Sequence, residues 1–145
     1  LQFKGIPSFS PEIFKELINL DPMKSKQLEK GIQQLTDEGL ANLFVQELGS
    51  RKYVGTVGEL QFEVLQYRLE HEYQAKCRFD PRVIHKACWM TGPDADLKDF
   101  MRFRQQNIAF DKDGNPVFLA ETAFILRSAI DKYPDITFHT TSEML

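Results

Sequence analysis

The chain is short of cysteine, of tryptophan and of long apolar runs. Its two cysteines, Cys77 and Cys88, lie among apolar, strand-like residues and lack the paired spacing of a disulfide framework. We therefore expect two buried thiols in a reducing compartment. No apolar run approaches the roughly 20 residues that cross a bilayer, and the chain starts at Leu1 without a secretion signal. These absences predict a cytoplasmic protein with no membrane partner, excised from a longer chain.

The sequence also lacks an excess of basic charge. Its 18 Lys and Arg residues are outnumbered by 21 Asp and Glu residues, for a net charge of −3. Nonspecific phosphate binding depends on accumulated Lys and Arg, so a protein whose whole surface grips nucleic acid is excluded, whereas a local basic patch is not. With 145 residues, 42% of them hydrophobic, the chain can form one ordinary domain or two very small ones.

Motifs for catalysis are missing as well. No G-x-x-x-x-G-K-[ST] loop is present, so the chain encodes no nucleoside triphosphate site. The loop 111–115 begins like a calcium loop, but no Glu stands at its twelfth position, and a hairpin turn explains it better. The histidines are far apart and match no metal or nucleophile spacing: His71, His85 and His139. We expect no catalytic, cofactor-binding or metal-binding residue in this chain.

The pattern of apolar residues predicts the elements that follow Leu20. Asp21 can cap a helix, and Pro22 suits its first position. The β-rich segments on either side of the turn at 48–50 indicate a hairpin. The next helix carries an apolar stripe of Phe62, Leu65, Leu69 and Tyr73. In order, we predict a helix over 22–38, strands over 40–47 and 51–57, a helix over 59–73 and a strand over 75–79, closed by Asp80 and Pro81.

The second half repeats this order in outline. Its elements are a strand over 83–90, a helix over 94–107, strands over 108–110 and 116–120, a helix over 123–133 and a strand over 136–139. The first helix places Leu97, Phe100, Met101 and Arg104 on one side, and the second, capped by Thr122, carries Leu126, Ala129, Ile130 and Tyr133. No repeat is visible residue by residue. The halves form either one elaborated domain or two small packed plaits.

A motif at the start of the helix over 59–73 resembles a known family. The pattern Gly-Glu-Leu-x-x-Glu-x-x-x-x-Arg-Leu marks the third domain of ribosomal translocation GTPases, and it is matched by Gly58, Glu59, Leu60, Glu63, Arg68 and Leu69. Stretches over 3–14, 21–24, 35–39, 119–122 and 132–138 look like the C-terminal region of the bacterial peptide chain release factor 3 family. Leu60-Gln61-Phe62 and the ending Lys132-Tyr-Pro-Asp-Ile-Thr-Phe138 favour that family over the translocases, whose motif usually has His after Leu.

The resemblance implies a fold. Ser10-Pro11-Glu12 is a good helix opening, but the family makes the segment 12–20 a first strand, and we follow the family. The first half is then β-α-β-β-α-β, the ferredoxin-like plait, in an α+β protein. We expect a lead-in from a preceding β-barrel over 1–10, followed by the release factor C-terminal domain over 11–145. That domain divides into a ferredoxin-like half over 11–80 and a second α/β half over 81–145.

The resemblance also implies a function. The parent protein holds GTP or GDP and Mg in an upstream G domain, enters the terminating ribosome and promotes departure of class I release factors. In that scheme this chain is a non-catalytic domain that contacts small-subunit RNA and protein. Two alternatives stay open: a domain of a translocase-like elongation GTPase, and a freestanding ferredoxin-like module that binds a small ligand.

Basic side chains are the candidates for ribosome contact. They are Arg51, Lys52, Lys76, Arg78, Arg82, Lys86, Arg102 and Arg104. Such charges can bind RNA phosphates, or they can solvate an exposed face and pair with neighbouring acids. Most of the 12 phenylalanines fall on predicted core faces, and no strand has the pattern of an RNA recognition motif, so we expect core packing rather than base stacking. We expect structural roles for the six motif residues.

Overall fold

A computed structural model describes residues 10–140. The first half contains β1 (Ile13–Asn19), the 3-10 turn η1 (Pro22–Lys24), α1 (Ser25–Asp37), β2 (Asn42–Gln46), β3 (Lys52–Thr56), α2 (Glu59–Glu72) and β4 (Cys77–Arg82). The second half contains β5 (Lys86–Thr91), α3 (Asp94–Phe103), the 3-10 turn η2 (Gln105–Asn107), β6 (Ile108–Phe110), β7 (Pro116–Ala120), α4 (Ala123–Lys132) and β8 (Thr137–His139). The predicted lead-in lies, apart from Ser10, outside the described residues.

All eight strands form one antiparallel sheet in the order β4-β1-β3-β2-β6-β7-β5-β8. The first four strands have the order of a ferredoxin-like plait, and the last four have the same order read from the other end. The plaits join where β2 pairs with β6, with Val45 opposite Phe110 and Gln46 opposite Ala109. This pairing covers two strand edges that would otherwise be open. The predicted fold class is confirmed, including the similar order of the second half.

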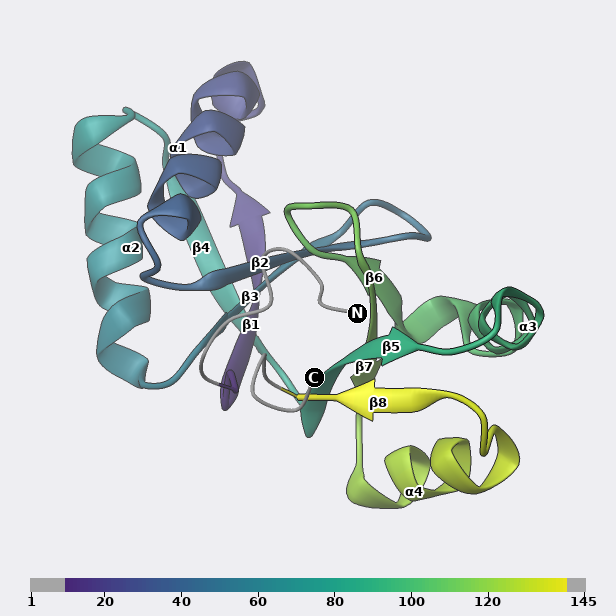
Figure 1. The fold of residues 1–145 in the computed structure, drawn as a ribbon. Coiled ribbons are helices and arrows are strands. Elements are labelled where there is room, and N and C mark those ends of the chain that lie inside the picture. Colours follow the sequence, from purple (N-terminus) through teal and green to yellow (C-terminus); the bar gives the residue numbers. More distant parts are fainter. Residues whose placement is uncertain (1–9, 141–145) are drawn as a thin grey trace.

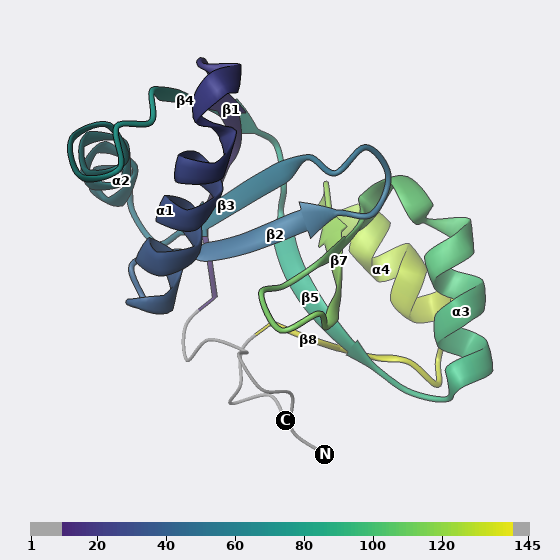
Figure 2. The ribbon, with the colours of Figure 1, turned by 90° about the horizontal axis from the view of Figure 1, so that it is seen from above.

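Each plait buries one face of its strands under its own two helices. In the first plait, α1 and α2 contribute Leu28, Ile32, Leu35, Phe62, Leu65 and Leu69 to a core with β-strand residues such as Val54 and Cys77. In the second, α3 and α4 cover Cys88, Met90, Ile108 and Phe118. Figures 1 and 2 show α1 and α2 on one side of the strands and α3 and α4 on the opposite side. The helices therefore form the two outer layers.

The faces without helices pack against each other in a third core. Phe14 of β1, Phe44 of β2 and Tyr53 of β3 meet Trp89 of β5 and Leu119 of β7 there. Phe44 is fully buried, and its ring centroid lies 6.2 Å from that of Phe14 and 5.7 Å from that of Trp89. We call this cluster the joint core. The sheet surface on which a ferredoxin-like protein could stack nucleobases is thus internal here. This agrees with the expectation that the phenylalanines pack in the core rather than stack on bases.

The segment after Pro11 is a strand, in agreement with the family and against its local helix signals. β1 pairs with β3 on one side and with β4 on the other. Two ladders of hydrogen bonds and the burial of Phe14 and Leu17 outweigh a favourable helix start. The helix predicted from Pro22 begins with η1, where the Asp21 side chain accepts a hydrogen bond from the Met23 backbone N–H at 3.1 Å. The hairpin of β2 and β3 lies where it was predicted.

Several boundaries differ from the prediction. β4 runs through Pro81 to Arg82, which is tolerated because β4 is an edge strand. The strand expected from Val83 begins only at Lys86, and Val83 is 83% exposed in the linker between the plaits. α3 ends at Phe103, so Arg104 lies beyond it. Ile130, expected on the buried side of α4, is 46% exposed because Ala129 and Tyr133 occupy the core side.

The loop between β6 and β7 is closed from within by one carboxylate. Asp111 accepts hydrogen bonds from the backbone N–H groups of Asp113 at 3.0 Å and Asn115 at 2.8 Å. Its other oxygen accepts from Trp89 Nε1 at 2.8 Å. The carboxylate of Asp111 thus accepts hydrogen bonds from both the loop and the joint core. This supports the prediction of a hairpin at 111–115 rather than a calcium loop.

Candidate functional site

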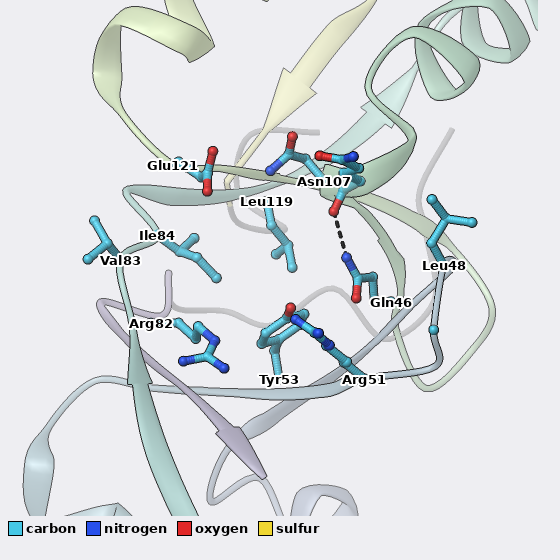
Figure 3. Close-up of a pocket in the computed structure, with 12 residues that line it drawn as sticks. Gln46, Leu48, Arg51, Tyr53, Arg82, Val83, Ile84, Asn107, Leu119 and Glu121 are labelled. Carbon is cyan, nitrogen blue, oxygen red and sulfur yellow. Dashed lines mark hydrogen bonds between the residues drawn. The ribbon is translucent and has the colours of Figure 1, made fainter. Parts of the chain in front are cut away.

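An open pocket of 580 Å³ lies at the seam between the two plaits. Its walls come from the β2–β3 hairpin, the linker after β4, the turn η2 and the end of β7. Figure 3 shows Arg82 and Arg51 on one wall and Glu121 and Asn107 on the wall that faces it. We call it the seam pocket. Its lining residues are Gln46, Leu48, Gly49, Arg51, Tyr53, Arg82, Val83, Ile84, Gln106, Asn107, Leu119 and Glu121.

The floor of the seam pocket is apolar and its rim is polar. Tyr53 and Leu119 are buried members of the joint core, and Ile84 packs against that core. On the rim, Gln46 Nε2 donates to the Gln106 carbonyl at 2.7 Å, which ties the hairpin to η2 (Figure 3). The pocket therefore joins the two plaits through both its floor and its rim.

Arg51 is one of two exposed cations that line this pocket, and Arg82 is the other. Arg51 follows the turn between β2 and β3, and it makes no ion pair with any residue that the structure describes. Lys52 follows it as the first residue of β3. A guanidinium without an acidic partner can offer its full fork of N–H donors to a phosphate or a carboxylate. Of the two predicted basic residues that line the pocket, Arg51 is therefore the one that can bind an anion without losing an ion pair.

Arg82 and Arg78, by contrast, have acidic neighbours. Arg82 donates to the carboxylate of Glu16, a residue only 8% exposed on β1. Arg78 donates to both oxygens of Asp80, at 2.7 and 3.2 Å, and this hydrogen bonding lowers the pKa of the Asp80 carboxyl and raises that of Arg78. Since residues two apart on a strand share a face, the Arg78–Asp80 pair could have been expected from the sequence.

The other predicted basic residues lie apart from the seam pocket lining. Lys76 is exposed just before β4, and Lys86 is the first residue of β5. Arg102 is exposed in the last turn of α3. Arg104 lies over the ring of Phe103, 5.2 Å from its centroid, and its buried Nε has no hydrogen-bond partner in the described part of the chain. The structure thus brings Arg51 and Arg82 into one pocket and leaves the other candidates outside its lining.

The six motif residues divide between packing and surface. Gly58 precedes the first residue of α2 in extended conformation, and Glu59 pairs with Lys15 of β1. Leu69 is fully buried in the first plait's helix-covered core. Leu60, however, is 67% exposed, and Glu63 is exposed as well. Packing inside this chain therefore explains Leu69 of the motif but not the exposed residues Leu60 and Glu63.

Arg68 holds the two helices of the first plait together. It donates to Glu72 one turn further along α2, with Nε at 2.7 Å, and to Glu38 after α1, with Nη1 at 2.8 Å. These bonds lower the pKa of the Glu72 carboxyl and raise that of Arg68. Nearby, a Cβ on Gly31 of α1 would come within 2.7 Å of Leu69 Cδ2. The two helices approach closely at Gly31, and the hydrogen bonds of Arg68 connect them on the solvent-exposed side.

Groups that could perform chemistry are separated or buried. Burial raises the pKa of the Cys77 and Cys88 thiols to about 12, and both are free. His71 stacks on Tyr67, with ring centroids 4.0 Å apart, whereas His139 is buried and lies 2.8 Å from Thr91 Oγ1. Within residues 10–140 there is no group of three His, Cys, Asp or Glu side chains placed to hold a metal ion.

The same residues contain no helix long and apolar enough to cross a membrane. The described surface does offer a polar-rimmed pocket with an arginine that makes no ion pair among the described residues. The seam pocket could not be found by sequence reasoning, because its residues come from four segments that carry no shared pattern. Arg51 and Arg82 were predicted, whereas the pocket residues Gln46, Tyr53, Asn107 and Glu121 were not.

Comparisons with known proteins identify the family. Residues 3–130 match the family described as "Class II release factor RF3, C-terminal domain". Over 144 residues the chain is 43% identical to the peptide chain release factor 3 of Aromatoleum aromaticum, which covers 99% of this chain and 26% of the relative. The chain therefore spans about a quarter of that relative's length.

The chain is also similar to a protein of Thermus thermophilus whose crystal structure is solved. The matched region covers 63% of this chain and 15% of the Thermus chain, with 21% sequence identity and a TM-score of 0.45. The fold assignment rests instead on the strand order described above. The family match spans both plaits up to α4, and the relative matches along nearly the whole chain. This chain accordingly belongs to the family of class II release factor RF3 C-terminal domains.

Proposed function

We propose that this chain is the non-catalytic, ribosome-contacting domain of a cytoplasmic, GTP-dependent release factor that promotes dissociation of class I release factors. The observation that carries the proposal is the family match over residues 3–130, together with the relative named peptide chain release factor 3. GTP or GDP and Mg belong to a G domain upstream of this chain. The chain's own contribution is differential binding, which makes one ribosome conformation more favourable than another.

Such a role requires a rigid body, and the joint core supports one. The two plaits share a continuous sheet through β2 and β6, and they bury Phe44 and Trp89 between them. We propose that residues 11–145 act as one lever, with its halves at 11–80 and 81–145, and that residues 1–10 lead in from a preceding β-barrel. A motion of the upstream domains then displaces the lever as a unit.

The contact surface we propose centres on the seam pocket. Arg51 has no acidic partner among the described residues, so binding a phosphate costs it no ion pair. Lys52 adjoins it, and Gln106 and Asn107 offer amide donors on the facing wall. Arg82 contributes less because Glu16 already neutralises it. Ribosomal RNA phosphates are therefore the proposed ligands of this rim. Lys76, Arg78, Lys86, Arg102 and Arg104 serve as weaker contacts of the small-subunit RNA and protein.

The proposal is tested with the full-length factor and purified ribosomes. Arg51→Glu should weaken association at low salt and reduce the slope of log K against log salt by about 1, as expected when one phosphate contact is lost. Lys30→Glu is the matched control, since it makes the same charge change at an exposed position of α1. Equal salt slopes for the Arg51 variant, the control and the parent would reject the seam pocket as an RNA contact.

A further inference from the structure

The seam pocket is larger than a single phosphate contact requires. Its volume of 580 Å³ falls within the range of roughly 300–1,000 Å³ that is usual for pockets that hold small molecules. Its floor is apolar, because Leu119 is a buried member of the joint core and Ile84 packs against that core. A phosphate held at the rim by Arg51 would leave this floor uncovered. The pocket therefore has room for a flat, partly apolar group beside the anion.

The charges around the seam pocket balance each other instead of accumulating. Arg51 has no acidic partner in the described part of the chain, and the charge of Arg82 is already met by Glu16. On the facing wall, Glu121 makes no ion pair with any of residues 10–140 (Figure 3). Its carboxylate repels a second phosphate. A ligand that fits both walls presents an anion to Arg51 and N–H donors to Glu121.

Two more polar groups of the seam pocket have no partner. Tyr53 is 8% exposed, and its hydroxyl makes no hydrogen bond with a described residue although the oxygen is not fully enclosed. A tyrosine hydroxyl buried to this degree usually has a partner. The side-chain amide of Asn107, on the wall of Glu121, likewise makes no hydrogen bond within residues 10–140 (Figure 3). Unpaired polar groups that surround an apolar floor are typical of a ligand site.

A nucleotide carries all of the matching features in one unit. Its phosphate suits a guanidinium, its base has apolar faces, and its Watson–Crick edge carries N–H donors. Guanine places two donors, N1–H and one N2–H, side by side, and they can bond both oxygens of a carboxylate. Adenine, cytosine and uracil put an acceptor beside the donor at that edge, which a carboxylate repels. No single amino-acid side chain combines an anion, a flat apolar face and paired N–H donors.

We propose that the seam pocket binds one unstacked guanine nucleotide of ribosomal RNA. The phosphate lies on Arg51, the base covers the apolar floor, and the Watson–Crick edge donates to Glu121. The Tyr53 hydroxyl and the Asn107 amide bond the remaining polar atoms of the nucleotide. This inference rests on the proposed function, which places an RNA phosphate at the rim, and it adds the base that enters the pocket.

The test uses kethoxal, which modifies accessible guanines at N1 and N2, on ribosomes saturated with the full-length factor. The parent should protect an unpaired guanine whose reactivity rises about fivefold or more with Glu121→Gln, because the amide cannot accept both N–H bonds. Protections common to the parent and the variant report that the ribosomes are equally occupied. Glu47→Gln is the matched control, since Glu47 is exposed on the same hairpin as Arg51 and lies outside the pocket lining. Its protections should equal those of the parent.

A second variant tests the same nucleotide from the floor of the pocket. Tyr53→Phe removes only the hydroxyl and keeps the ring in the joint core, so it should expose the same guanine and no other. Identical guanine protections for the parent, Glu121→Gln and Tyr53→Phe would overturn the nucleotide pocket.

The salt dependence of Arg51→Glu separates this failure from failure of the proposed function. A reduced salt slope with unchanged guanine protections would leave the phosphate contact in place and point to a protein group in the pocket. An unchanged slope together with unchanged protections would reject both the phosphate contact and the nucleotide pocket.

Discussion

Truncating Phe44 to alanine tests whether the two plaits form one cooperative body. Phe44 is fully buried in the joint core and touches aromatic rings from both sides of the seam, Phe14 at 6.2 Å and Trp89 at 5.7 Å between centroids. A Phe→Ala change at such a position costs about 3–5 kcal/mol, from lost burial and the cavity left behind. Phe44 belongs to the first plait, yet the loss should destabilise both plaits.

The assay is urea unfolding followed by two signals. Far-UV circular dichroism reports all helices and strands, whereas fluorescence reports Trp89, the single tryptophan of the chain, which lies inside the joint core. The two transitions should coincide in the parent and in Phe44→Ala, with the variant's midpoint shifted to lower urea. Phe124→Ala is the matched control, because Phe124 is 73% exposed and its loss should change stability by less than about 0.5 kcal/mol.

Two results would contradict a single cooperative body. If Phe44→Ala cost less than about 1 kcal/mol, the joint core would not have the packing that the structure gives it. If the fluorescence and dichroism transitions separated in the parent, the plaits would unfold independently and could not act as one lever.

Three further predictions follow from individual contacts. Asp111→Ala should cost about 1–3 kcal/mol in urea unfolding, because Trp89 Nε1 and two backbone N–H groups lose their acceptor, and a midpoint within error of the parent would contradict that role. Leu69→Asp should abolish the cooperative thermal transition, because it buries a charge where the leucine is fully enclosed; a melt like the parent's would exclude this placement of α2. Arg68 lowers the folded-state pKa of Glu72, so the stabilisation from this pair is present above the ordinary glutamate pKa of about 4.3 and is lost as pH falls through the folded-state value. Arg68→Met should therefore flatten the acid side of the stability profile, and an unchanged profile between pH 5 and pH 2 would argue against a stabilising Arg68–Glu72 pair.

Much of the fold could be predicted because local signals and tertiary structure agree. The limits of β6 and β7 follow from a turn-rich loop between β-forming residues, and Thr122 caps α4 through a 3.0 Å bond from the Ile125 backbone N–H. β1 is different, since its local sequence favours a helix and only pairing with β3 and β4 makes it a strand. The family resemblance was needed there.

The sequence analysis predicted neither the seam pocket nor the joint core. A signal for the joint core does exist, because β5 is apolar at consecutive positions from Ala87 to Met90, and strands buried on both faces show such runs. That pattern shows that both faces are covered without showing what covers them. The partner of Arg82 was also hidden, since Glu16 is 66 residues away in sequence and meets it only across the β1–β4 ladder.

The most direct measurement is an electron cryomicroscopy map of the full-length factor bound to a terminating ribosome. We expect the two plaits to keep the arrangement described here, with Arg51 at the seam pocket within hydrogen-bonding distance of ribosomal RNA phosphates. A map in which the seam pocket faces solvent, or in which the plaits separate at the β2–β6 junction, would contradict it.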